Sequence, residues 1–356
     1  MKKSISKISP ILMSVLLGGT FASQTTLAGV AVDDEGKVQL YGDLRLRAEY
    51  DNREFVSSTS DDQNRDRLRY RARVGVNWKA TDDVTANIRL ATGTSDPQSP
   101  HANMDLSNHS GGGFGVDRAF ATYTGLNNAK VVVGIAAPLY WQQTELFWDG
   151  DINLQGLQAA YKMGPATLNA SYGVTQENGI PGEDSKVLST QAVFSQSGIT
   201  AALGYAGYSK PKAGGFDPRA TFGAREFYQI AAQYKSGGFL VGLDYQTAAG
   251  VEEEDEAYVL QGRYNLGKND SVRLYYWHVE ANSAHLTQDD SRASSNFEGP
   301  EIQFKHKYSK TTSVRARLFL MQQVSDDASV VQSNFNTMGV TKDKDLRLRF
   351  DFDVKF

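Results

Sequence analysis

Residues 67–79 of the chain read RLRYRARVGVNWK. Every even position in this stretch is apolar or aromatic, and every odd position is charged, polar or glycine. Successive side chains of a β-strand point to opposite faces, whereas a helix would scatter these arginines around its whole circumference. The stretch therefore predicts a strand with one apolar face and one charged face.

The same alternation runs through most of the sequence. Residues 346–356 read LRLRFDFDVKF and residues 38–50 read VQLYGDLRLRAEY, so both also have one apolar and one charged face. Further segments, some with weaker alternation, bring the number of predicted strands to about sixteen. They span residues 83–93, 116–125, 129–137, 152–163, 165–174, 186–195, 199–208, 225–235, 239–247, 256–265, 271–280, 300–308 and 312–322.

The connections between these segments are alternately short and long. The short ones, such as 80–82, 126–128 and 236–238, are rich in Gly, Asn, Asp and Ser, as tight hairpin turns require. Both ends of the sheet then fall on the short-turn side, where the last strand can pair with the first. A sheet that crosses hydrocarbon must close, because unpaired backbone groups there cost several kcal/mol each. The sequence predicts an all-β fold, a transmembrane antiparallel β-barrel with short periplasmic turns and long external loops. A soluble all-β sandwich or lipocalin-like barrel is the alternative, and it accounts poorly for the alternating loop lengths.

The first 28 residues are predicted to be a signal peptide. Three lysines precede a broken apolar stretch at 8–21, and small residues follow, with a plausible cleavage after Ala28 or, alternatively, after Ala22. Removing three lysines and no acids changes the formal charge from −4 to −4 − 3 = −7. No later segment has eighteen consecutive apolar residues, which argues against spanning helices, and the charge gives no footprint for nucleic acid. The barrel domain would then occupy residues 29–356.

A narrower resemblance lies between residues 131 and 157. The chain reads VVVGIAAP from residue 131, then WDGD from residue 148 and QGL from residue 155. This is similar to a stretch in the Gram-negative outer-membrane proteins of the "putative porin" family, apart from Ala136 in place of a basic residue and Gln155 in place of Glu. The resemblance implies a general-porin-like barrel in the outer membrane, surrounded by lipid and lipopolysaccharide, and a possible homotrimer.

The terminal Phe356 also fits this resemblance. It ends a strand of alternating aromatic residues, like the signal that the barrel-assembly machinery reads. The plainer interpretation is that Phe356 anchors the last strand at the periplasmic interface. Both interpretations can hold together.

The predicted site is a charged constriction. The resemblance implies that the third external loop, near 138–151, folds into the barrel; it carries the acids Glu145, Asp149 and Asp151. Its four large aromatic residues suit packing inside the barrel or at an interfacial girdle. Facing the loop, the inward positions of adjacent strands form a basic wall: Arg45, Arg47, Arg67, Arg69, Arg71, Arg73, Arg89, Arg315, Arg317, Arg347 and Arg349. Arg45, Arg69, Arg71 and Arg347 are the residues expected at mid-height.

The function predicted from these features is passive diffusion of small hydrophilic solutes and ions across a transverse field. An alternative for the arginines is that they only neutralise nearby carboxylates in a wide lumen. The alternative function is a substrate-specific channel or a structural barrel with little conductance. Ion preference stays open, because the wall favours anions and the net charge favours cations.

Other candidate sites are weak. GRYNLGK at 262–268 lacks the Ser or Thr and the helix of a phosphate-binding loop. The five histidines show no metal-ligand spacing, and no nucleophile motif is present, so neither an enzyme, a cofactor nor a metal site is expected. The acidic run 252–256 is best explained as a solvated loop.

Overall fold

The computed structural model describes residues 29–54, 63–93, 99–104, 113–176, 184–209, 226–284, 295–325 and 344–356. These residues form sixteen long antiparallel strands and two strands of two residues, β1 and β5. The predicted fold class, a closed antiparallel barrel of sixteen strands, is confirmed. The predicted signal peptide lies outside the described residues.

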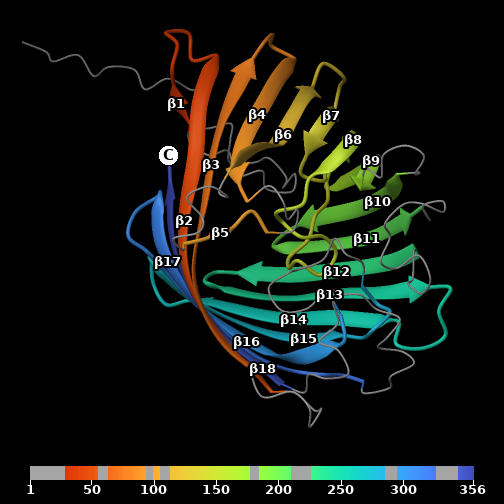
Figure 1. Cartoon of the computed structure of the whole chain (residues 1–356). Coiled ribbons are helices and arrows are strands. Elements are labelled where there is room, and N and C mark those ends of the chain that lie inside the picture. The colour runs from red at the N-terminus through yellow and green to blue at the C-terminus, as the bar shows by residue number, and fades with distance from the viewer. Residues whose placement is uncertain are drawn as a thin grey trace, which may run out of the picture.

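The strands follow the chain around the barrel (Figure 1). Their bounds are β1 Val30–Ala31, β2 Val38–Glu54, β3 Gln63–Lys79, β4 Val84–Thr92, β5 Ala102–Asn103, β6 Phe114–Tyr123, β7 Ala129–Ala136, β8 Leu154–Met163, β9 Ala166–Gln176, β10 Ser185–Gln196, β11 Ile199–Tyr208, β12 Glu226–Ser236, β13 Phe239–Ala249, β14 Glu256–Asn265, β15 Asp270–Val279, β16 Phe297–Lys307, β17 Thr312–Gln322 and β18 Lys344–Lys355. Within the described ranges, no helix is long and apolar enough to cross a membrane.

The barrel closes where β18 pairs with β2, from Lys344 opposite Glu54 to Lys355 opposite Asp43. Phe356 continues the pairing: its N–H donates to the carbonyl of Gly42, and the N–H of Gly42 donates back to Phe356, both at 3.1 Å. β1 pairs with β2 at positions 39–40, just beyond the end of β18. β1 and β18 therefore share one edge of β2, and the described strands leave no open edge at the seam.

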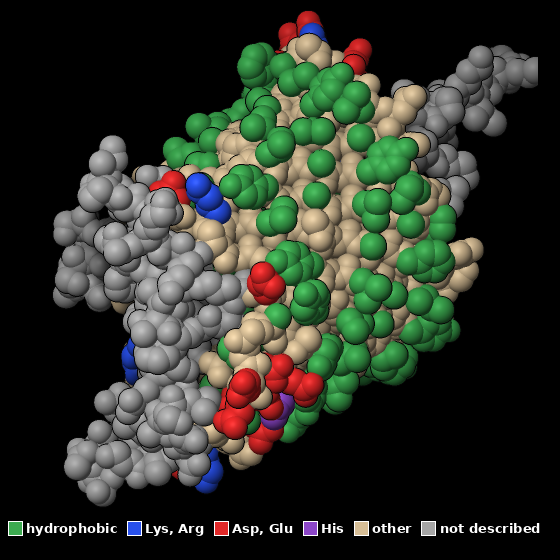
Figure 2. Space-filling view, turned by 90° about the vertical axis from the view of Figure 1, so that its right-hand side faces the viewer, with side chains coloured by type: hydrophobic (Ala, Val, Ile, Leu, Met, Phe, Trp, Pro, Cys, Tyr) green, Lys and Arg blue, Asp and Glu red, His purple; other side chains and the backbone are tan. Residues whose placement is uncertain are grey.

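The outer face of the wall is apolar and the inner face is polar. Outward positions such as Leu68, Leu203 and Phe350 are exposed, and Figure 2 shows hydrophobic side chains spread over the outer surface. Their partners on the inner face, such as Arg47, Gln158 and Gln246, are buried among one another. This is the division that the alternating sequence predicts for a barrel in lipid.

Two local features differ from the predicted strands. β2 and β3 are longer than predicted and reach Glu54 and Gln63, because cross-strand pairs of opposite charge continue above the predicted ends, as where Arg65 donates to Asp51 at 2.6 Å. The long connection after β4 contains β5, which pairs with Arg69 and Tyr70 of β3. β5 therefore extends the wall beside β3 where β4 has already ended.

Candidate pore constriction

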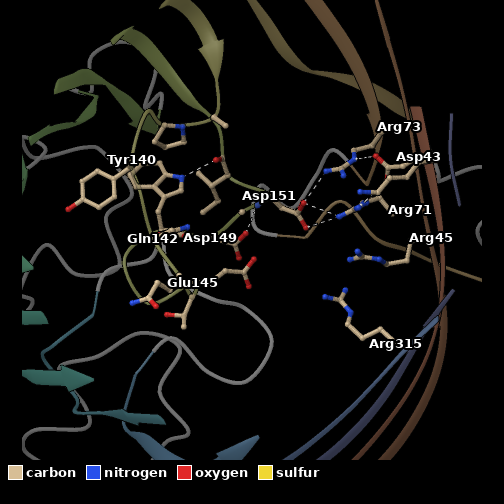
Figure 3. A pocket seen from close by; sticks show the side chains of 18 of the residues that line it. Asp43, Arg45, Arg71, Arg73, Tyr140, Gln142, Glu145, Asp149, Asp151 and Arg315 are labelled. Atoms are coloured by element: carbon tan, nitrogen blue, oxygen red, sulfur yellow. Dashed lines mark hydrogen bonds and ion pairs between the residues drawn. The ribbon is translucent and has the colours of Figure 1, made fainter. Parts of the chain in front are cut away.

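A cavity of about 1060 Å³ lies inside the barrel, between the segment that joins β7 to β8 and the wall formed by β2, β3 and β17. Figure 3 shows its two sides: Asp149, Asp151 and Glu145 belong to the β7–β8 loop, and Arg45, Arg71 and Arg315 come from the opposite wall. We refer to residues 137–153 as the inner loop.

Polar side chains from neighbouring strands hold the first part of the inner loop through its backbone. The N–H of Leu139 donates to Gln158 Oε1 at 2.6 Å. Gln191 on β10 accepts from the N–H of Trp141 at 2.8 Å and donates to its carbonyl at 2.7 Å. A glutamine can bind both the N–H and the carbonyl of one residue because its amide carries both an acceptor and donors.

The aromatic residues of the inner loop are buried against the inner wall. Tyr140, Trp141 and Phe147 pack with inward side chains of β10 to β17, while Trp148 packs in a second cluster with Phe227. Burying a large apolar side chain contributes about 1.5–3 kcal/mol. The inner wall is thus apolar where the loop lies on it and charged where it faces the cavity.

Asp244 on β13 anchors the tip of the inner loop. Its carboxylate accepts hydrogen bonds from the N–H of Thr144 at 2.9 Å, from Thr144 Oγ1 at 2.7 Å and from Gln143 Nε2 at 2.9 Å. The carboxylate is buried, so these donors replace the water it would otherwise bind. The tip is therefore bound to the wall opposite the arginines.

The other end of the inner loop reaches the arginine wall. The N–H of Asp151 donates to Asp149 Oδ1 at 2.6 Å, which turns the chain so that the Asp151 carboxylate meets Arg71 at 3.1 Å and Arg73 at 3.3 Å. Burial alone would raise the pKa of the Asp151 carboxyl, but the two guanidinium groups outweigh burial and lower its pKa below the ordinary value. Asp151 is therefore ionised and ties the loop across the lumen.

On the wall itself, single carboxylates bridge pairs of arginines. Asp351 accepts from Arg47 at 2.6 Å and from Arg315 at 2.9 Å. Asp43 likewise accepts from Arg71 at 3.0 Å and from Arg73 at 2.8 Å. Because one negative charge serves two positive ones, the wall keeps an excess of positive charge although its arginines are paired.

The remaining predicted arginines are paired in the same manner. Arg45 binds Asp353, Arg89 binds Asp117, Arg317 binds Glu301, Arg347 binds Asp51 and Arg349 binds Glu49. Arg67 also reaches Glu49, and Arg69 donates to Ser99 Oγ at 2.9 Å. The contacts of Arg45, Arg67, Arg347 and Arg349 join β18, β2 and β3 on their inner face, whereas Arg89 joins β4 to β6 and Arg317 joins β17 to β16.

One segment of the chain matches the model of a known protein family. Residues 45–199, less than half of the chain, match the family model described as "Putative porin". This matched segment includes β3, the inner loop and most of the arginines described above. Over this segment the chain is similar to that family. No curated protein matches its sequence.

Solved structures of porins share the fold of this chain at low sequence identity. The OmpF of Salmonella typhi, in a complex with daunomycin, has a TM-score of 0.61 and 13% identity, over 90% of this chain and 97% of that one. The anion-selective porin from Comamonas acidovorans has a TM-score of 0.58 and 14% identity, over 90% and 99%. A mutant of the Rh. blastica porin has a TM-score of 0.51 and 15% identity, over 90% and 100%. These likenesses show that the barrel fold of the chain is shared with porins.

In this chain, most of the predicted basic residues line one cavity. Those in its lining are Arg45, Arg47, Arg71, Arg73, Arg89, Arg315, Arg317 and Arg349, together with Glu145, Asp149 and Asp151. Arg69 and Arg347 do not line it, although both were expected at mid-height. Arg347 lies near the outer end of β18, whereas Arg69 lies opposite Arg47 of β2 and its side chain binds Ser99 and the carbonyl of His101.

Several residues of the site were missed at the sequence level. Arg118, Arg263, Arg273 and Lys305 also line the cavity, and the alternation of their strands could have identified them as inward. Asp244 could have been identified as the one acid on the inward face of its strand. His101 lines the cavity as well, and nothing local in the sequence indicates that it is buried.

Proposed function

We propose that this porin allows passive diffusion of small hydrophilic solutes and ions through a constriction between the inner loop and the arginine wall. The proposal rests on one observation: side chains of opposite charge face each other across one cavity (Figure 3). Glu145 and Asp149 lie on the loop side, and Arg45 and Arg315 lie on the wall side. A solute that passes between them crosses a transverse field, which orients dipoles and separates the paths of anions and cations.

The anchors of the inner loop support a fixed opening. Asp244 binds the tip at one wall, and Asp151 binds the other end at the opposite wall. A segment held at both ends, with buried aromatic side chains between them, does not need a solute to order it. We therefore propose a permanently open passage that selects by size and charge.

The proposal includes export and assembly. Residues 1–28 act as a signal peptide, and the barrel-assembly machinery recognises the last strand with Phe356 at its end. The folded barrel lies among outer-membrane lipid and lipopolysaccharide, as a homotrimer. The seating of Phe356 against Gly42 supports a role for this residue in closing the barrel.

Planar-bilayer recordings of the purified porin test the proposal. We expect an ohmic conductance that increases with salt without saturation. In a salt gradient, Arg315→Ala should move the reversal potential toward cation preference and Glu145→Gln toward anion preference, because each substitution removes one charge from one side of the opening. A matched control is Lys79→Ala, an exposed residue at the end of β3. A barrel without conductance, or reversal potentials that are equal in all variants, would refute the mechanism.

A further inference from the structure

A short segment of the second external connection enters the lumen beside the arginine wall. Thr92, the last residue of β4, holds it in place: Thr92 Oγ1 accepts from the N–H of Ala72 at 3.1 Å and donates to the carbonyl of Pro100 at 2.8 Å. Arg69 donates to the carbonyl of His101 at 3.2 Å. These bonds fix the backbone on both sides of His101.

The side chain of His101 lines the same cavity as the constriction. It is 8% exposed, and neither of its ring nitrogens has a hydrogen-bond partner among the residues that the structure describes. In the same cavity, the Nε–H of Arg71 also lacks a hydrogen-bond partner within the described chain. A buried donor without a partner costs about 1–3 kcal/mol, so native proteins seldom keep one without a reason.

The charges around His101 are positive. Burial lowers the pKa of His101, and the guanidinium groups of Arg47 and Arg71 lower it further. The imidazole is therefore neutral at physiological pH and carries one N–H donor. In this wall, the five arginines at positions 45, 47, 71, 73 and 315 pair with the carboxylates at positions 43, 351 and 353 and with Asp151 of the inner loop, so five positive charges meet four negative ones.

We propose that His101 and the neighbouring arginines form a binding site for a small oxyanion, a carboxylate or a phosphate, at the wall of the constriction. This inference rests on the proposed function and makes it more specific, because it adds a resting place on the path of an anion. The oxyanion would accept a hydrogen bond from the His101 ring and one from Arg71 Nε–H. Excess positive charge on the wall would balance its charge.

The neutral imidazole also explains why the site would release its ligand. A further cation at this position would strengthen the hold on every anion, whereas a neutral donor adds directional recognition at lower electrostatic cost. Oxyanions would then be held more strongly than chloride, because only they offer oxygen acceptors at fixed angles. The expected result is a transient, saturable block of chloride current.

The test measures single-channel chloride current through the intact porin as inorganic phosphate or succinate is added at constant ionic strength. Wild-type current should fall with a half-blocking concentration that His101→Leu raises by about tenfold, the loss expected for one hydrogen bond to a charged acceptor in a wet site. His306→Leu, which alters a histidine at the far end of β16, is the matched control and should leave it unchanged. Block by phosphate alone or by succinate alone supports the site and assigns its ligand class.

Two results would overturn the inference and leave the proposed function intact: conductance without block by either anion, or equal block in wild type and His101→Leu. If His101→Leu fails to assemble, Thr92→Val decides, because it keeps the shape of the side chain and removes the hydrogen bond from Thr92 Oγ1 to the Pro100 carbonyl. Its half-blocking concentration should also rise, and an unchanged value would count against the site. Absence of any conductance in the wild type would instead refute the proposed function.

Discussion

Asp244 provides the sharpest test of how the inner loop is held. Its carboxylate accepts three hydrogen bonds, two from Thr144 through Oδ2 and one from Gln143 through Oδ1. In Asp244→Asn, one of the two oxygens becomes an NH2 group that faces a donor. At least one bond is lost, and the others weaken because the acceptor no longer carries a charge.

The size of the effect follows from these bonds. A hydrogen bond to a charged group contributes about 1.5–3 kcal/mol, so Asp244→Asn should shift the balance between attached and detached loop tip by roughly ten- to a hundredfold. Asp244→Ala removes all three bonds and should have a larger effect. The bonds of Leu139 and Trp141 remain in both variants, so the tip should detach while the base of the loop stays in place.

Single-channel recording measures this detachment as current fluctuation. We expect wild type to give a steady open level, Asp244→Asn to add brief steps, and Asp244→Ala to add more frequent ones. Asp270→Asn is the matched control, since Asp270 is an acid at the start of β15 that pairs with His306 and not with the loop. Folding of Asp244→Ala is checked by the shift in its electrophoretic mobility on heating. If the variant folds normally and its current traces match those of wild type, the role of Asp244 as an anchor is refuted.

Three further predictions concern closure, pH and stability. Gly42→Val should reduce the yield of folded barrel in refolding assays, since a Cβ there would lie 2.5 Å from the Phe356 ring and 2.6 Å from a backbone oxygen; normal yield would contradict this. The pKa of Asp151 is lowered below the ordinary 3.8, so its stabilising contact is complete at pH 7 and is lost only as pH falls below about 4. Channel noise should therefore stay constant down to that pH. Noise that begins above pH 5 would contradict this. Glu49→Gln should lower barrel stability in urea by about 3 kcal/mol, because it leaves the buried Arg349 without its ion pair; an unchanged midpoint would contradict this.

The fold could be predicted because the information is local. In residues 67–79 the polarity of each side chain shows whether it faces outward or inward, and neighbouring strands have the same alternation of apolar and polar residues. Register follows with little ambiguity, since a slip of one residue would turn arginines such as Arg71 toward lipid. Sixteen strands could therefore be counted before any contact was known.

The candidate site could be predicted only in part, since its contacts join distant residues. Thr144 and Asp244 lie 100 positions apart, and no local pattern couples them. The position of His101 depends on where β4 ends and β5 resumes pairing with β3, which no alternation records. Arg347 was misjudged in height because the alternation fixes the face of a strand and not where its ends lie along the barrel axis.

The two interpretations of the arginine wall, a polarised surface and a set of neutralised ion pairs, do not exclude each other in this arrangement. Asp351 faces Arg47 directly across the seam between β18 and β2, and it also reaches Arg315 on the other side. Each carboxylate thus lowers the cost of holding two guanidinium groups close together, and without it the like charges would repel. Neutralising part of the charge is what allows the rest to be concentrated in one place. The excess positive charge of the wall then depends on strand register, and it faces the loop acids without any flexible side chain having to move.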